Sequence, residues 1–549
     1  MSTLNETIYF LGVDVGTGST RAALFTQNGN IVQSSTSPIK TWNPKFGYFN
    51  QSSIDIWNAC IRVIKDVVRG VDPRNIKGMG FDATCSLVVL NKDGLPLPVC
   101  PDSDSDQNII LWMDHRAHEE ADFINQTNHS VLRSAGGKIS LEMEIPKLLW
   151  LKKNMRDTYD NAGYFFDLPD FLTWQASGAD SRSLCSVVCK WTYEANNKGN
   201  IGWNAEFFKQ IGLDDLLQSN NFKKIGYKML APGTPCGNGL TDKVAKLLGL
   251  LPGTAVGTSM IDAHAGGLGL IGCNVPGFTL DFGSRLGLIC GTSTCHMAVS
   301  KEAVFVPGVW GPYWSAMVPE MWLSEGGQSS TGKLIDHIIE THPAYKSIKS
   351  KLDENTIVVN YLNTILERMT KEKNLECVDM LTSDLHVWPD FHGNRSPLAN
   401  PTLRGMISGL TLSHDEESLA LLYLATIQAL SYGTLHIIEA LENAGHSKMS
   451  CVLVCGGLSK NLLFLNTQAN VIGRPVLLPS QKESVLCGAA MLGACASGVY
   501  PTVVDAIEGM AGDAQLIPPN NLTIQYHLKK YKVFLRMIAD QEAYRKIMQ

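Results

Sequence analysis

Blocks of apolar residues along the chain predict strands and helices in alternation. Apolar runs of strand length occupy residues 10–13 and 22–25, and a longer strand-like run covers residues 76–90. Residues 54–68 carry apolar side chains at helical spacing behind two serines that can cap a helix. The first two runs are joined by a glycine-rich turn, which predicts a hairpin at the start of an α/β fold.

The tip of this first hairpin is polar and reads Asp14, then Gly16-Thr17-Gly18-Ser19. Glycines let backbone amides approach an anion, and the hydroxyls of Thr17 and Ser19 can donate to phosphate oxygens. An aspartate at a strand end can hold a hydrated magnesium ion. A glycine-rich hairpin without a ligand explains the stretch equally well, because short glycine motifs recur by chance.

A second stretch repeats this arrangement in residues 280–299. Apolar runs flank the turn Gly291-Thr292-Ser293-Thr294. Two such hairpins indicate an internal duplication into two α/β halves, and we place the boundary near residues 272–277. The expected domains are therefore residues 1–272 and 273–549.

Two more glycine pairs stand where a strand is expected to turn into a helix. Glu325 precedes Gly326-Gly327 and a helix expected from about residue 330, and Gly456-Gly457 precedes a helix expected from about residue 460. Such glycines let the backbone approach a ligand, and helix N-termini favour negative charge. The alternative is that these glycines only shape the turns.

Asp262 and the most apolar segment of the chain each allow two interpretations. Asp262 follows a short strand and precedes a glycine run, so it is either a helix N-cap or a carboxylate that faces a cleft. Residues 418–440 are strongly apolar but contain Gln428, Ser431 and His436. That mixture favours a buried helix over a membrane span.

Size and composition narrow the class of protein. A chain of 549 residues is too long to fold around a single hydrophobic core, since domains average about 150 residues. A 44% hydrophobic share, an 18% charged share and a net charge of −6 without basic clusters argue against nucleic acid or an anionic membrane as a partner and favour a small molecule. The 14 cysteines form no CxxC pairs, and no secretory signal is visible, so we expect reduced thiols and a cytoplasmic location.

Taken together, the motifs resemble the FGGY carbohydrate kinases over residues 8–500, and within them the ribulokinase branch, the eukaryotic D-ribulokinases in particular. The segments that carry the resemblance are GVDVGTGSTR, WMDHRA, SAGGKISLEMEIPKLLWL, GGQSSTGKLIDHI, HGNRSP with PTLRGMISGL, and GGLSKN. The resemblance implies two ribonuclease-H-like domains of the actin and sugar-kinase type that flank a central cleft. Sugar would bind mainly to the first domain and ATP mainly to the second.

The resemblance also implies roles for individual residues. Asp262 matches the catalytic base, which also touches the sugar, and Asp14 matches the metal-linked carboxylate. The phosphate loops would be formed by Thr17, Gly18, Ser19, Gly291, Thr292 and Ser293. The sugar-side positions are Asp82, Thr84, Asp114, Arg116, Lys190 and Glu325. The nucleotide-side positions are Gly327, Gln328, Gly456, Gly457 and Asn461. One departure is that the family commonly has Gln and Asp in the helix after the last glycine pair, where this chain has Asn466 and Asn470.

The implied reaction is ATP-dependent phosphorylation of a ketopentose with magnesium. D-ribulose is favoured over L-ribulose, D-xylulose or a longer ketose. A non-catalytic sensor of nucleotide and sugar is a second hypothesis, against which the presence of Asp14, Asp262 and Lys190 argues. An actin-like or chaperone-like ATPase is a third, but the sugar-side residues would have no role there. The sequence allows a homodimer and leaves the epimer of the sugar open.

Overall fold

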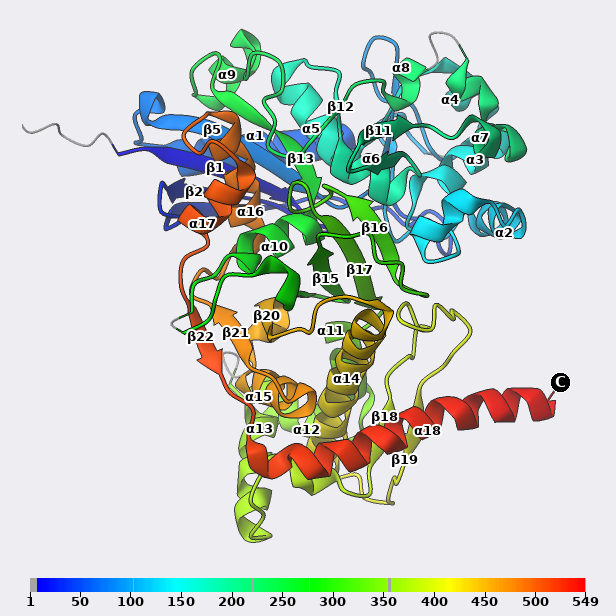
Figure 1. Cartoon of the computed structure of the whole chain (residues 1–549), viewed down its shortest axis with the longest axis vertical. Helices are drawn as coiled ribbons and strands as arrows, with labels where there is room; N and C mark the ends of the chain where they lie inside the picture. The colour runs from blue at the N-terminus through cyan, green and yellow to red at the C-terminus, as the bar shows by residue number, and fades with distance from the viewer. Residues whose placement is uncertain (1–6, 102, 219–221, 276, 354–356, 549) are drawn as a thin grey trace, which may run out of the picture.

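The computed structural model describes residues 7–101, 103–218, 222–275, 277–353 and 357–548. Two α/β domains lie one above the other, with the first part of the chain in the upper domain of Figure 1 and most of the second part in the lower. Residue 276, inside the boundary expected at 272–277, lies outside the described residues.

The upper domain is built on a five-stranded sheet whose order is β13-β5-β1-β2-β3. Its strands are β1 (Tyr9–Val15), β2 (Ser19–Thr26), β3 (Ile31–Pro38), β5 (Ile76–Ala83) and β13 (Ala255–Ile261). The first three strands are antiparallel neighbours, and β5 and β13 add in parallel. The predicted hairpin at the chain's start is therefore confirmed as β1 and β2.

The lower domain repeats this topology in a seven-stranded sheet whose order is β16-β17-β15-β14-β20-β21-β22. Its strands are β14 (Arg285–Cys290), β15 (Thr294–Ser300), β16 (Trp310–Trp314), β17 (Trp322–Gln328), β20 (Cys451–Gly456), β21 (Val476–Pro479) and β22 (Ala514–Ile517). Strands β14, β15 and β17 are antiparallel, and β20 and β21 add in parallel. The two sheets share the ribonuclease-H-like order, so the predicted fold and duplication are confirmed.

Two helices cross between the sheets and join the domains. α10 (Asp262–Ile271) follows the last strand of the upper sheet and packs on β14 and β20 of the lower sheet. α16 (Ser484–Ala496) follows β21 and packs on β1, β5 and β13 of the upper sheet. The two helices also pack against each other, and a Cβ atom on Gly269 would lie 2.0 Å from the carbonyl oxygen of Ser484. Only glycine allows this approach, so α10 and α16 form a tight apolar joint between the domains.

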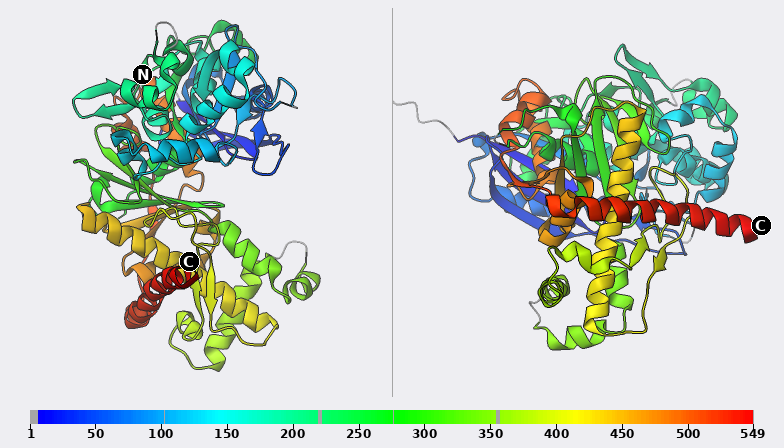
Figure 2. Two further views of the ribbon diagram at one scale, coloured as in Figure 1. Left: turned by 90° about the vertical axis from the view of Figure 1, so that its right-hand side faces the viewer. Right: turned by 60° about the horizontal axis from the view of Figure 1, so that its bottom comes forward.

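The apolar segment predicted as a buried helix is α14 (Glu416–Ala444), the central helix of the lower domain. It is long and apolar enough to cross a membrane, but 78% of its most apolar window is buried inside the protein. It packs against α13 (Val358–Glu372) and α15 (Leu462–Ile472), as the two views of Figure 2 also show. The prediction of a buried helix is confirmed.

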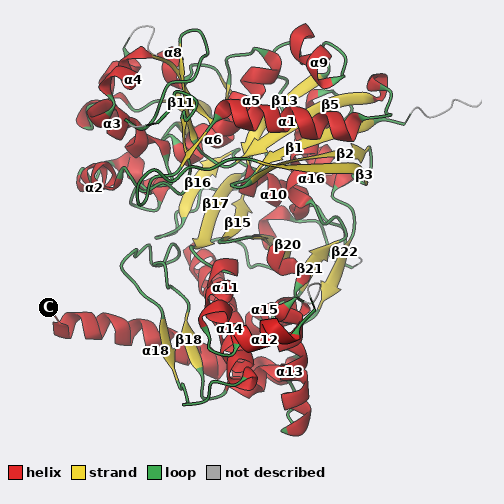
Figure 3. Ribbon diagram, turned by 180° about the vertical axis from the view of Figure 1, so that it is seen from behind, coloured by secondary structure: helices red, strands yellow, loops and turns green. Residues whose placement is uncertain are grey.

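The remaining elements cover the sheets or extend from them. The predicted helix at 54–68 is α1 (Ser53–Val68), capped by Ser52. The strand-like run at 76–90 is in fact two strands, β5 and β6, in different sheets, with a bend at residues 84–86. The C-terminal helix α18 (Ile524–Met548) crosses the lower domain and projects beyond it, as seen from behind in Figure 3.

The other helices are α2 (His118–Gln126), α3 (Glu144–Asn154), α4 (Arg156–Asn161), α5 (Leu168–Ser177), α6 (Leu184–Lys190), α7 (Ala205–Gln210), α8 (Phe222–Ile225), α9 (Asp242–Leu248), α11 (Gly332–Thr341), α12 (Tyr345–Lys351) and α17 (Val503–Met510). The other strands are β4 (Asn50–Gln51), β6 (Leu87–Asn91), β7 (Ile109–Ile110), β8 (Ala162–Asp167), β9 (Arg182–Ser183), β10 (Glu194–Asn196), β11 (Gly199–Gly202), β12 (Met229–Leu230), β18 (His386–Trp388) and β19 (Met406–Ser408).

Candidate active site

A cleft between the domains is lined by residues from both sheets, and both predicted hairpin tips reach it. The first hairpin contributes Gly16 and Thr17, and the second contributes Gly291, Thr292 and Ser293. Gly18 and Ser19 belong to the same first turn but are not among the residues that line the cleft. Two hairpins that are far apart in the sequence therefore meet at one site.

The first hairpin tip is held in place from the upper domain. The Gly16 amide donates to the Ser19 carbonyl oxygen at 3.0 Å, which closes the turn. The Trp112 indole donates to the Thr17 hydroxyl at 3.0 Å, and the Gln51 amide donates to the Thr17 carbonyl oxygen at 2.9 Å. These bonds fix Thr17 before any ligand binds.

The second hairpin tip is also closed by a backbone hydrogen bond from its first glycine, which here spans one residue fewer. The Gly291 amide donates to the Ser293 carbonyl oxygen at 2.8 Å. The Thr331 amide, just before α11, donates to the Thr292 carbonyl oxygen at 2.9 Å. The cleft is thus bordered by two rigid glycine-hydroxyl turns of like construction, the kind of backbone that binds phosphate.

Three aspartates lie where parallel strands of the upper sheet end. Asp14 on β1 is in register with Asp82 on β5, and Asp262 follows β13 directly. The Arg21 guanidinium donates to Asp14 at 2.8 Å and also pairs with Glu483. Asp82 is fully buried, and its burial together with the Asp14 charge raises its pKa well above the usual range. Burial and the Asp14 charge therefore both favour the protonated form of Asp82.

Asp262 is the first residue of α10, and its carboxylate lines the cleft. The N-cap position belongs to Ile261, so the alternative that Asp262 serves as the helix cap is wrong. One carboxylate oxygen accepts a 2.7 Å hydrogen bond from the Ala263 amide. Burial, and then the charge of Asp14, raises the pKa of Asp262 to about 7. A carboxylate with that pKa can accept a proton near neutral pH.

Lys190 and Glu325 face each other across the cleft from opposite domains. Lys190 ends α6 of the upper domain, Glu325 lies on β17 of the lower, and their charged atoms are 3.5 Å apart. Burial opposes both charges, but the surrounding opposite charges together outweigh it, so the pKa of Lys190 lies well above its usual range and that of Glu325 below. Both side chains are therefore ionised in the cleft.

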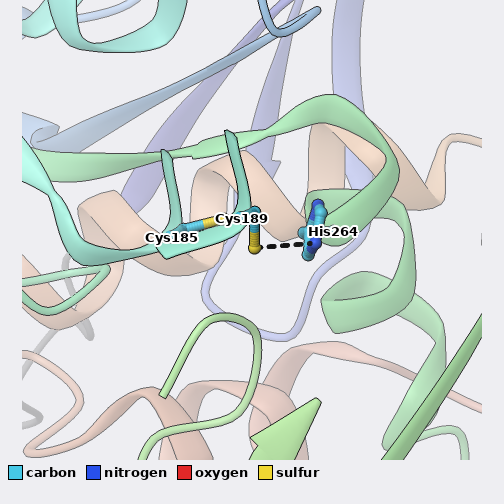
Figure 4. Close-up of side chains that lie close together, drawn as sticks. All are labelled: Cys185, Cys189 and His264. Carbon is cyan, nitrogen blue, oxygen red and sulfur yellow. Dashed lines mark hydrogen bonds between the residues drawn. The ribbon is translucent and has the colours of Figure 1, made fainter. Parts of the chain in front are cut away.

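His264 is a buried neighbour of Glu325. Its Nε2 atom lies 3.5 Å from a Glu325 carboxylate oxygen and 3.6 Å from the Cys189 sulfur, as Figure 4 shows for the thiol contact. Cys185, Cys189 and His264 bring their ligand-type atoms within 4.8 Å of one another, a spacing that a metal ion also uses. Burial raises the thiol pKa of Cys189 well above its usual range and lowers the pKa of His264 to about 4. A protonated thiol and a neutral imidazole at this distance can share a hydrogen bond.

Not all predicted sugar-side residues line the cleft. Thr84 does, at the bend after β5, whereas Asp82, Asp114 and Arg116 are not among the lining residues. Asp82 is fully buried, and its contact with the sugar stays a prediction. Asp114 and Arg116 are buried and pair with each other at 2.7 Å, and Asp114 also accepts a hydrogen bond from the Phe49 amide. Their placement makes them supports of the surrounding loop, and contact with the sugar stays a prediction for this pair.

The predicted nucleotide-side residues lie in the lower domain outside the lining of the cleft. The expected turn at Gly326-Gly327 is wrong, because both glycines lie inside β17 and α11 begins only at Gly332. The Gln328 amide donates to the Leu430 carbonyl oxygen at 2.8 Å. Gly326 and Gly327 belong to the strand because their backbones pair with β15.

The second glycine pair does stand where a strand ends. Gly456 has φ 88°, and a Cβ atom there would lie 2.3 Å from the Cys290 carbonyl oxygen, so this position requires glycine. Gly457 follows in a short turn, and Asn461 caps α15 by accepting a hydrogen bond from the Leu463 amide at 3.1 Å. Contact of these residues with a nucleotide stays a prediction.

Sequence reasoning assigned no role to Glu142 and Arg395, which also line the cleft. Their side chains form a 2.6 Å ion pair between the upper and the lower domain. Both lie in motifs that carried the family resemblance, SAGGKISLEMEIPKLLWL and HGNRSP. Both residues stand in these motifs, but the sequence did not predict a contact between residues that are 253 positions apart.

Comparisons with known proteins agree with this architecture. Residues 9–269 match the N-terminal domain and residues 286–497 the C-terminal domain of the FGGY family of carbohydrate kinases. The chain is 54% identical to the human FGGY carbohydrate kinase domain-containing protein over 98% of both chains. It is 39% identical to a D-ribulokinase of Saccharomyces cerevisiae over 90% of this chain and 72% of that one. The structure of a xylulose kinase from Rhodospirillum rubrum superposes with a TM-score of 0.77 at 17% identity, covering 98% of this chain and 99% of that one. The chain therefore belongs to the FGGY family of carbohydrate kinases, enzymes that phosphorylate sugars with ATP.

Proposed function

We propose that this kinase phosphorylates a ketopentose, D-ribulose in the first place, with Asp262 as the general base and a magnesium ion beside Asp14. The observation that carries the proposal is the cleft itself, which brings Asp262, both glycine-hydroxyl turns and the Lys190–Glu325 pair together. The resemblance to a relative that is named a D-ribulokinase supports the choice of sugar.

Phosphoryl transfer asks a protein mainly to position donor and acceptor and to stabilise negative charge. Asp262 accepts the proton of the attacking sugar hydroxyl, for which a pKa of about 7 is well placed. Its bond from the Ala263 amide orients the carboxylate while leaving the second oxygen for the substrate. The base therefore needs no further partner in the protein.

The two turns hold the phosphates of ATP from both sides. Backbone amides and the hydroxyls of Thr17, Thr292 and Ser293 donate to phosphate oxygens. Asp14, which lines the cleft, is an oxygen donor of the kind that suits magnesium, an ion that usually keeps several waters and binds through one or two carboxylates. Magnesium, when bound, neutralises charge on the phosphates. The adenosine end is expected on the lower domain, at Gly456, Gly457 and Asn461.

Lys190, Glu325 and Thr84 give the sugar a mixed set of donors and acceptors. Lys190 donates, Glu325 accepts and the Thr84 hydroxyl does both. A sugar that lacks a matching hydroxyl leaves one of these buried groups unpaired, at a cost of about 1 to 3 kcal/mol. Discrimination among ketoses follows from this match.

The test is ADP release measured by a coupled assay with D-ribulose, L-ribulose, D-xylulose, longer ketoses and polyols, each against a reaction without sugar. The proposal predicts the highest kcat/KM for D-ribulose and little ADP release without sugar. A higher kcat/KM for another sugar overturns the choice of substrate. ADP release at the same rate with and without sugar favours an ATPase. No ADP release at all favours a sensor.

Two further expectations join the proposal. A cytoplasmic, reducing setting is supported by the fourteen cysteines, all of which are free. A homodimer stays a prediction from the sequence.

A further inference from the structure

The two domains contact each other around the cleft through three polar or aromatic pairs that differ in exposure. Lys190 and Glu325 are deepest, with 2% and 5% of their side chains exposed. Arg395 and Glu142 are nearer to solvent, at 12% and 19%. His392 and His115 are exposed and stack with their ring centroids 6.3 Å apart. The series runs from the interior of the cleft to its rim.

The outer two contacts come from one segment of the lower domain, residues 389–397, which we call the rim segment. Within the described chain, its hydrogen bond from Arg395 to Glu142 is the only one that it makes to residues 7–272. The contact is therefore made by side chains alone, whereas the joint at α10 and α16 on the other side is apolar and tightly packed.

The rim segment itself is stiff. The Asn394 side chain donates to Asp390 at 2.7 Å and accepts from the Leu398 amide at 2.9 Å. The Ser396 hydroxyl donates to the Gly308 carbonyl oxygen at 2.8 Å, which ties the segment to its own domain. A stiff segment moves together with its own domain. Its contact with Glu142 therefore depends on the distance between the two domains.

Arg395 also belongs to the cleft wall. Its guanidinium lies 5.5 Å from the Trp310 ring, and Lys190 lies 4.3 Å from the same ring. A Cβ atom on Gly327 would lie 2.7 Å from the Arg395 side chain, so glycine at this position of β17 leaves room for the arginine. Arg395 is thereby held beside the residues proposed to bind the sugar.

We propose that the Glu142–Arg395 ion pair is a clasp that holds the cleft closed at its sugar end, and that these two residues position the sugar for phosphorylation. The inference rests on the proposed function, because it treats the Lys190–Glu325 end of the cleft as the sugar end. A partly exposed ion pair is strong enough to favour closure and weak enough to open for exchange of sugar. Closure removes water from the cleft and aligns the sugar hydroxyl with Asp262.

A double-mutant cycle tests the clasp. The variants are Glu142→Gln, Arg395→Met, both together, and the charge exchange Glu142→Lys with Arg395→Glu. Each single change should raise the KM for sugar about 10- to 100-fold, as loss of a charge-assisted hydrogen bond would, with a smaller change in kcat. The double variant should be no worse than the worse single, and the charge exchange should recover part of the loss.

Two kinetic results would overturn the clasp. One is a normal KM in Glu142→Gln with a large loss in Arg395→Met, which would mean that Arg395 contacts the substrate itself. The other is additive losses in the double variant. A matched control is Arg474→Met, which breaks a pair of similar exposure, Arg474 with Glu442, inside the lower domain and should leave the KM unchanged.

Hydrogen exchange without any sugar separates failure of the clasp from failure of the proposed function. In Glu142→Gln and Arg395→Met, residues 140–143 and 389–397 should exchange faster than in the wild type, while the α10 and α16 joint stays protected. Unchanged exchange in the two variants contradicts the clasp even if the enzyme turns over D-ribulose. If exchange is faster in the variants but the enzyme phosphorylates no sugar of the panel, the clasp is supported and the proposed substrate is wrong.

Discussion

Replacing Asp262 by asparagine removes the proposed base with little other change. Asparagine has the same shape, and its carbonyl oxygen can keep the 2.7 Å hydrogen bond from the Ala263 amide. It cannot accept the proton of the sugar hydroxyl. General-base assistance typically contributes about 10²- to 10⁴-fold, which corresponds to about 2.7 to 5.4 kcal/mol of barrier. We therefore expect kcat to fall by that factor.

Stability and sugar binding should stay close to those of the wild type. Because the pKa of Asp262 is about 7, folding already tolerates a neutral side chain at this position. The assay pairs steady-state ADP release with calorimetric titration of sugar in the absence of ATP. Asp170→Asn is a matched control: Asp170 is a buried carboxyl with a pKa also near 7, but it lies outside the lining of the cleft. A kcat within tenfold of the wild type for Asp262→Asn would refute the assignment of the base.

Two other substitutions probe the metal and sugar sides. Asp14→Asn should raise the magnesium concentration needed for half-maximal activity about 10- to 100-fold, because a carboxylate that orients a hydrated ion is lost, while the KM for sugar changes little. A shift in the KM for sugar with unchanged magnesium dependence would contradict this role. Lys190→Met takes the ammonium partner away from the buried Glu325 carboxylate and should lower the free energy of unfolding by about 3 to 5 kcal/mol, with a rise in the KM for sugar. Glu325→Gln should cost less, and thermal unfolding of both variants checks the order.

The local pattern of the sequence was enough to predict both hairpins, because each consists of neighbouring apolar runs around one turn. The duplication followed from the repeat of the turn at Gly16 and Gly291. The buried helix α14 was likewise readable, since its polar residues have no place in a membrane. In each of these elements the determining contacts are close in sequence.

The sequence did not predict the positions of residues that are fixed by contacts with distant parts of the chain. Asp114 and Arg116 face each other because the loop folds back on residues 48–50. Gly326 and Gly327 stay in a strand because β15 pairs with them. The Glu142–Arg395 pair joins two domains and residues that lie 253 positions apart in the sequence. Each of these depends on tertiary packing that overrides the local signal.

The pH dependence of kcat/KM for D-ribulose at saturating ATP tests the central claim, that Asp262 is tuned by burial to act as the base. Only its ionised form accepts a proton, so kcat/KM should fall about tenfold for each pH unit below a pKa near 7 and be level above it. His264, with a pKa of about 4, stays neutral through this range and adds no step. The residual activity of Asp262→Asn should lack the acid limb. A wild-type profile that is level down to pH 5, or the same limb in Asp262→Asn, would contradict the account.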